Sequence, residues 1–365
     1  MKGRINQIKN PEVAIDGREV GLRHPAFIVA ELSGNHLGSY KTAVKLIKAT
    51  AKAGADAVKL QTYTPDTMTL DSKKPWFIVG GKDNPGEWKG KTLYELYKNA
   101  HTPWEWQPKL KKIAEGLGLI LFSTPFDETA VDFLEKMNVP CYKISSYEVT
   151  DIPLLERVAR TRKPVILSVG FANLSEIKQA VETLRKNGCS QIALLHCATA
   201  YSDTPDLGKM NLQTIKRLRT RFGVVSGFSD NNAGIEIPLY SVAMGASIVE
   251  KHFILDRDKG GPDAQFSIEP AELAQLVKTI RNFEKTKGKV HYGPADSKER
   301  YNKRFRRSIF VVTDIKKGDV FTTDNIRVIR PALGLSPSLL GEVIGKRATQ
   351  DIKKGTPLNS KMVSK

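Results

Sequence analysis

The chain has 365 residues, of which 40% are hydrophobic and 26% are charged, and its formal net charge is +18. These values are typical of a globular protein of about two to three domains and exclude a disordered or fibrous chain. No apolar run approaches the ~18 residues that a membrane helix needs, so we expect no membrane partner.

The excess of positive charge raises the question of nucleic-acid binding. Only residues 303–307 (KRFRR) form a dense basic run, and neither a recognition motif nor an aromatic ladder accompanies it. We therefore interpret the run as a solvated surface or a linker contact and expect no nucleic-acid partner. The net charge can instead attract small anionic substrates.

The N-terminus and the cysteines indicate the compartment. Basic residues begin the chain (MKGRINQIKN), but no apolar segment follows them, so no secretory signal is predicted. The three cysteines, Cys141, Cys189 and Cys197, cannot all pair and lack metal-ligand spacing. We expect reduced cysteines and a cytoplasmic protein.

Apolar runs with strand character alternate with amphipathic segments along most of the chain, after a turn at Asp16 and Gly17 that indicates a hairpin. The amphipathic segments 174–187 and 269–287 each stop at a glycine. The runs are 26–32, 57–62, 119–124, 141–146, 164–170, 192–198, 223–230 and 247–254. Eight such units predict an α/β fold, a closed (β/α)8 TIM barrel over about residues 24–287, with the hairpin covering its bottom.

The connection 63–103 is too long for an ordinary barrel loop. Two interpretations are open: an ordered lid or sugar-facing wall, or a small satellite core packed on the barrel. Its aromatic residues are Tyr63, Trp76, Phe77, Trp88, Tyr94 and Tyr97.

The pattern changes after Gly288, where we expect the barrel domain (1–288) to end. A polar linker (289–304) precedes a β-rich unit (305–365) in which DIKKGD at 314–319 recurs as DIKKGT at 351–356. Two copies of a strand-turn unit predict a compact pseudo-symmetric domain, since a solenoid needs more repeats.

Polar side chains cluster at the predicted carboxyl ends of the strands, where a barrel carries its active site. Lys59 and Lys143 lie inside apolar runs, where an unpaired ammonium group is costly, although a lone lysine there can also extend to the surface. Two lysines, several hydroxyls and a glycine turn predict an anion pocket suited to phosphate. Carboxylates and His252 suit a hydroxylated substrate and a divalent metal, although His252 taken alone could be a hydrogen-bonded core residue.

The chain also resembles a known family. AELSGNHLG, AVKLQTY, FSTPFD, YKISSYE, HCATAYSDTP, GFSDNN and EKHFILD occur in the order typical of sialic (nonulosonic) acid synthases. QTYTPDTMTL, LYELYKNAHTPWEW and GGPDAQFS resemble the pseudaminic acid synthase branch. The C-terminal unit resembles the β-rich antifreeze-like (SAF) domain of the same family.

This resemblance implies an enzyme that condenses phosphoenolpyruvate with an N-acetylated amino sugar, 2,4-diacetamido-2,4,6-trideoxy-altrose in this branch, to a nine-carbon α-keto acid and phosphate. The alternatives are an N-acetylneuraminate or legionaminic acid synthase, or a catalytically weakened sugar-binding or scaffold protein. A domain-swapped homodimer is also implied.

The resemblance assigns roles to individual residues. The catalytic residues would be Glu31, Glu148, Tyr201, Glu250 and Asp263. Phosphoenolpyruvate would be held by Lys59, Lys143, Ser146, Ser168, Thr199 and Ser229. The acceptor sugar would contact Glu31, Tyr201, Asp263 and Arg330.

The metal position departs from the family pattern. The family has Ser-Asp-His where this chain has Ser229, Asp230 and Asn231, so the implied ligands are His252 and Asn231. An asparagine offers a neutral carbonyl oxygen, which suits Mg²⁺ or Mn²⁺ better than softer ions. We expect a divalent cofactor, Mn²⁺, Mg²⁺ or Co²⁺.

Overall fold

The computed structural model describes residues 10–80 and 88–365. The start of the chain, where no secretory signal was predicted, and residues 81–87 of the long connection lie outside the described residues. The chain divides into two compact units at Lys287 and Gly288. Within the described residues, no helix has both the length and the apolar character needed to cross a membrane.

The first unit is a closed barrel of eight parallel strands, as predicted. The strands are almost fully buried, because a parallel sheet covered on both faces needs apolar side chains on both. In barrel order they are β3 (Phe27–Glu31), β4 (Ala57–Thr62), β5 (Ile120–Pro125), β6 (Tyr142–Ile144), β7 (Val165–Ser168), β8 (Ile192–Ser202), β9 (Val225–Asn232) and β10 (Ile248–His252), which pairs back to β3.

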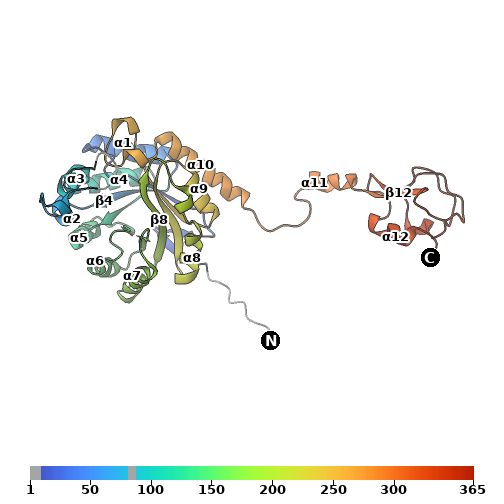
Figure 1. The fold of residues 1–365 in the computed structure, drawn as a ribbon, viewed down its shortest axis with the longest axis horizontal. Coiled ribbons are helices and arrows are strands. Elements are labelled where there is room, and N and C mark those ends of the chain that lie inside the picture. The colour runs from blue at the N-terminus through green and yellow to red at the C-terminus, as the bar shows by residue number, and fades with distance from the viewer. Residues whose placement is uncertain (1–9, 81–87) are drawn as a thin grey trace. The chain divides into compact units, whose positions relative to one another are not determined.

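Each strand is followed by a helix, and Figure 1 shows the helices around the strands. The predicted helices at 174–187 and 269–287 are α7 and α10, and Asn173 caps α7 by accepting hydrogen bonds from the N–H groups of Ser175 and Glu176. The helices are α1 (Tyr40–Ala53), α4 (Gln107–Gly116), α5 (Glu128–Lys136), α6 (Ile152–Ala159), α7 (Leu174–Lys186), α8 (Gln213–Phe222), α9 (Glu236–Ala243) and α10 (Pro270–Thr286). Two further helices, α2 (Pro65–Met68) and α3 (Leu93–Ala100), lie in the long connection after β4.

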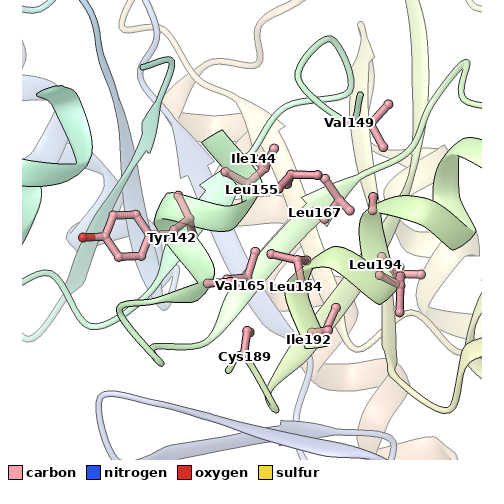
Figure 2. Packing of buried hydrophobic residues seen from close by; sticks show 14 of the residues in the cluster. Tyr142, Ile144, Val149, Leu155, Val165, Leu167, Leu184, Cys189, Ile192 and Leu194 are labelled. Carbon is pink, nitrogen blue, oxygen red and sulfur yellow. The ribbon is translucent and has the colours of Figure 1, made fainter. Parts of the chain in front are cut away.

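The core has layers inside and outside the barrel. Figure 2 shows one cluster outside it, where Ile144, Leu167 and Leu194 of three neighbouring strands pack with helix residues such as Leu155 and Leu184. Inside the barrel, the first residues of the strands form a second cluster with the N-terminal hairpin.

The hairpin consists of β1 (Glu12–Ile15) and β2 (Arg18–Gly21). Asp16 and Gly17 both have positive φ, at 51° and 76°, as expected for the tight turn that joins two paired strands. Ile15 and Val20 are fully buried against barrel residues at the amino ends of the strands. The hairpin therefore closes the end of the barrel opposite the strand carboxyl ends.

The second unit has its own core around Ile309, Phe321 and Leu358. Its elements are α11 (Ser297–Asn302), the antiparallel pair β11 (Ser308–Val311) and β12 (Ile326–Ile329), and α12 (Leu340–Val343). A short helix, α11, therefore occupies part of the predicted linker.

The sequence repeat of the second unit forms matching contacts. Asp314 pairs with Lys353 at 2.8 Å, and Asp351 pairs with Lys316 at 3.2 Å. Between them, Ile315 and Ile352 exchange two backbone hydrogen bonds. The two copies are thus related as a pseudo-symmetric pair.

Candidate functional site

A small polar pocket of about 70 Å³ lies at the carboxyl ends of the barrel strands. We call it the inner pocket. It brings together residues at the ends of β4, β6, β7, β8, β9 and β10 that the sequence predicted to share one site. Of the predicted site residues, those that line it are Lys59, Lys143, Ser146, Ser168, Tyr201, Ser229, Asn231, Glu250 and His252.

Two lysines and two carboxylates set the charge of the inner pocket. Lys59 is ion-paired with Glu31 and lies 3.8 Å from Glu250 Oε1, which is also 3.6 Å from Lys143 Nζ. Burial opposes the charged form of Lys59, but Glu250 and Glu31 outweigh it and raise the pKa of Lys59. Burial lowers the pKa of Lys143, whose ammonium group donates to Ile144 O. A lysine has three donors, so N–H groups of Lys143 remain for a bound anion.

Besides His252 Nδ1, which is described below, two buried polar atoms of the inner pocket have no hydrogen-bond partner among the described residues: Ser168 Oγ and Glu250 Oε2. Buried polar atoms are nearly always paired, so these two point to a ligand. The other hydroxyls are engaged, since Ser146 Oγ accepts from Gly170 N at 3.0 Å and Ser229 donates to Glu250 at 3.1 Å.

Thr199 lies beside the inner pocket. A Cβ added at Gly170 would lie 2.6 Å from Thr199 Cγ2, so glycine is required at 170 and the threonine methyl group packs against it. Thr199 is not among the residues that line the pocket. Its predicted contact with phosphoenolpyruvate stays a prediction.

A larger cavity of about 460 Å³, the outer cavity, adjoins the inner pocket. Both are lined by Gln61, Phe126, Ser145, Tyr147, Tyr201 and His252. The outer cavity adds the predicted residues Glu148 and Asp263. An extended ligand can therefore reach from one space into the other.

The long connection supplies one wall of the outer cavity. Tyr63, Trp88 and Tyr97 line it, whereas Trp76 is 70% exposed. Trp88 Nε1 donates to Pro262 O at 2.8 Å, which ties the connection to the turn before Asp263. This geometry favours the wall over a separate satellite core.

His252 and Asp263 face each other where the two spaces meet. His252 Nδ1 is buried, has no hydrogen-bond partner in the part of the chain that the structure describes, and lies 3.8 Å from Asp263 Oδ2. Burial, together with Lys59, Lys251 and Lys143, lowers the pKa of His252 well below its usual value. Burial raises the pKa of Asp263 to about 6, although Ser33 donates a hydrogen bond to its carboxylate.

The donors near His252 fit a divalent ion. A neutral imidazole with an unused buried nitrogen, a carboxylate and the amide of Asn231 are ordinary ligands for such an ion. Asn231 Nδ2 donates to Cys197 Sγ at 3.7 Å, which orients the amide. Among the residues described, three His, Cys, Asp or Glu side chains lie close enough to share an ion only at Glu12, Glu19 and His24, on the hairpin side. His252 is not part of such a group, so an ion bound there would also need amide or water oxygens as ligands.

The remaining predicted site residues are Glu31, in the barrel, and Arg330, in the second unit. Glu31 is buried and accepts from Ser33 N and Gln61 Nε2 in addition to Lys59, and it lines neither space. Arg330 follows β12 in the second unit and is exposed. The predicted acceptor contacts of both residues stay predictions.

Several residues that line the site were assigned no role from the sequence: Ser33, Gln61, Ser145 and Tyr147. Each is within two positions of a predicted residue. Their position at the carboxyl ends of strands was the signal that could have identified them as site residues.

Lys251, from the Glu-Lys-His strand end, is by contrast outside the site. It forms a fully buried ion pair with Asp230 at 2.8 Å. Successive side chains of a strand alternate between its two faces, so Glu250 and His252 share a face that Lys251 does not.

Comparison with known proteins shows the family of the chain. A family model described as the NeuB family matches residues 46–292, and a SAF domain model matches 306–364. The pseudaminic acid synthase of Helicobacter pylori is 40% identical over 338 residues, which cover 92% of this chain and 97% of that protein. The N,N'-diacetyllegionaminic acid synthase of Campylobacter jejuni is 36% identical, covering 89% and 96%. The crystal structure of the Bacillus subtilis spore coat polysaccharide biosynthesis protein spsE matches with a TM-score of 0.65 and 32% identity, covering 97% of this chain and 99% of that one. The chain therefore belongs to the NeuB family of phosphoenolpyruvate-condensing nonulosonic acid synthases and carries a C-terminal SAF domain.

Proposed function

We propose that this synthase is of the pseudaminic acid type and uses 2,4-diacetamido-2,4,6-trideoxy-altrose as its acceptor. The observation that carries the proposal is the inner pocket, with two buried lysines and an unpartnered serine, opening into a sugar-sized cavity. The choice of branch is supported by the 40% identity to a pseudaminic acid synthase.

The inner pocket would hold phosphoenolpyruvate. Lys59 and Lys143 supply charged donors and Ser168 an unused hydroxyl, which suits the phosphate and carboxylate of the donor. Because the pocket is buried, these interactions are stronger than they would be in water. The acceptor aldehyde would then approach from the outer cavity, past His252 and Tyr201, so that its carbon meets the methylene carbon of the enol.

The pKa values of two carboxyl groups are shifted in opposite directions. Lys143 and Lys59 outweigh burial and lower the pKa of Glu250, whereas burial raises the pKa of Glu148. The ionised Glu250 can stabilise the positive charge that develops at the enol carbon bearing the phosphate. Glu148 can exchange a proton with the water that adds to this carbon before the carbon–oxygen bond to phosphate breaks. Carboxylates whose pKa values are pushed apart are typical of such acid and base roles.

His252 and Asn231 are the residues that would hold a divalent ion, with Asp263 nearby. The ion would polarise the aldehyde oxygen and so make the carbonyl carbon a better electrophile. We also include in the proposal the domain-swapped homodimer and the contact of Arg330 with the acceptor's N-acetyl group, both supported by family membership.

The experiment is a comparison of acceptors. The full chain is incubated with phosphoenolpyruvate, Mn²⁺ and one of three sugars: the diacetamido-trideoxy altrose, the corresponding legionaminic acid precursor, or N-acetylmannosamine. We expect acceptor-dependent phosphate release and a nine-carbon product by mass, with the highest kcat/KM for the altrose. A higher value for the legionaminic acid precursor would contradict the branch. Binding of phosphoenolpyruvate without release of its phosphate in the presence of any of the sugars would indicate a scaffold protein.

A further inference from the structure

Helix α3 presents an apolar stripe to the outer cavity. Leu93, Leu96, Tyr97 and Ala100 are spaced i, i+3, i+4 and i+7, the spacing that gives a helix one apolar face. Such a face normally packs on a core, yet α3 has no buried residue, and all four side chains line the cavity. The stripe therefore covers space that a ligand can occupy.

The stripe is held in place by contacts at both ends of α3. Thr92 and Glu95 form a reciprocal capping box at its start. At its end, Gly34 packs closely against Ala100 and Pro262. A Cβ built on Gly34 would lie only 3.1 Å from Ala100 Cβ and 2.9 Å from Pro262 Cγ. The wall is thus formed before any ligand binds, as is usual for small-molecule sites.

The two sides of the outer cavity differ in polarity. Ser33, Gln61, Glu148 and Asp263 provide hydrogen-bonding groups from the barrel, whereas Met68 and Val79 of the long connection extend the apolar side formed by α3. A ligand that fills the cavity must place polar groups on one side and apolar groups on the other.

The position of α3 also determines which end of the acceptor it meets. No residue of α3 lines the inner pocket, where the phosphoenolpyruvate would bind. The aldehyde carbon must approach the inner pocket in order to react. The end of the acceptor remote from the aldehyde is therefore the end that lies against α3.

We propose that this stripe is a specificity subsite that selects acceptors with methyl groups at the end remote from the aldehyde: the 6-deoxy carbon and the methyl of a 4-acetamido group. The proposal rests on the proposed synthase function. A hexose with hydroxyls at these positions would bury them against Leu93 and Leu96 without hydrogen-bond partners. The stripe selects this class of sugar. It does not distinguish the diacetamido-trideoxy altrose from its stereoisomer, the legionaminic acid precursor.

The test compares kcat/KM for the diacetamido-trideoxy altrose and for N-acetylmannosamine, at saturating phosphoenolpyruvate and Mn²⁺. The wild-type chain should prefer the deoxy sugar by roughly 5- to 150-fold or more, the range expected for a buried unpaired polar group. Leu96→Asn, with Leu93→Asn as a second variant, should lower this preference at least about fivefold without changing the KM for phosphoenolpyruvate. Leu96→Met should retain the preference, and Leu117→Asn, a change at a 43% exposed leucine after α4, serves as control.

An equal fall for both sugars in both asparagine variants would overturn the proposal and make the stripe a packing surface. A change of oligomeric mass in these variants would also overturn it, because the stripe would then be covered by another chain. Absence of phosphate release by the wild-type chain with every sugar would instead refute the proposed function itself.

Discussion

Lys59 and Lys143 are both buried beside Glu250, but only Lys59 is also ion-paired with Glu31. The two lysines should therefore contribute equally to anion binding but differently to stability. Either change to Met removes a charged donor, so the KM for phosphoenolpyruvate should rise about ten- to a hundredfold, as for a lost hydrogen bond to a charged group of about 1.5–3 kcal/mol. Lys59→Met should also lower the free energy of unfolding more than Lys143→Met, because it leaves Glu31 without its ion-pair partner. Initial-rate kinetics and urea unfolding measure the two effects.

Lys111→Met is the matched control, since Lys111 pairs with Glu115 on the surface of α4. It should change neither KM nor stability by much, because surface ion pairs contribute little. Unchanged KM values in both pocket variants would contradict the anion site.

Asn231 decides how strongly the proposed ion is held. Replacing it by His adds an imidazole nitrogen, a better donor than an amide oxygen for Mn²⁺ or Co²⁺, so Asn231→His should tighten their binding about tenfold or more. His252→Ala should abolish metal-dependent turnover. Titration calorimetry with the ion alone measures the affinity independently of turnover.

Equal metal affinity in the wild type and Asn231→His would place the ion elsewhere. Turnover that survives removal of metal by a chelator would refute aldehyde activation by an ion.

At the scale of elements, His36 joins the turn after β3 to the segment before α4. Its Nδ1 accepts from Gly38 N and its Nε2 lies 3.1 Å from Thr102 Oγ1, so the ring is neutral with its proton on Nε2. Burial, with a smaller effect of His101, lowers the pKa of His36 to about 4 from an unperturbed 6.5. As the pH falls from about 7 to 4, the unfolded chain takes up a proton before the folded one does. The barrel should therefore lose about 3 kcal/mol of unfolding free energy over this range.

His36→Gln should remove this part of the pH dependence, while His291→Gln, at an exposed histidine, should leave it in place. Tryptophan fluorescence in urea reports the barrel, since all four tryptophans are at positions 76–106. The same pH slope in His36→Gln and wild type would show that His36 titrates normally.

The elements also show what the sequence could predict. The eight strands were predictable because apolar runs and glycine stops are local signals. The carboxyl end of β8 was not: predicted to end at 198, it continues to Ser202 with a register shift against β9. This irregular segment, in which Tyr201 has a φ of 48°, places Tyr201 in the site. The stripe of α3 and the Asp230–Lys251 pair were missed because both depend on tertiary packing.

At the scale of the whole molecule, the two units have separate cores, so each should fold without the other. A chain ending at Gly288 should therefore keep cooperative unfolding by tryptophan fluorescence and still bind phosphoenolpyruvate, whose proposed ligands are all in the barrel. Its turnover should be low, because Arg330 would be lost from the acceptor site that family resemblance implies.

Arg330→Ala in the full chain separates this role from a general effect of truncation. It should raise the acceptor KM roughly ten- to a hundredfold, the effect of a lost charged hydrogen-bond donor, and change the KM for phosphoenolpyruvate much less. Arg327→Ala is the control, because Arg327 is also exposed and lies three positions earlier, in β12. Full activity of the isolated barrel would refute a catalytic contribution of the second unit, since no residue beyond 288 would then be needed to bind the acceptor.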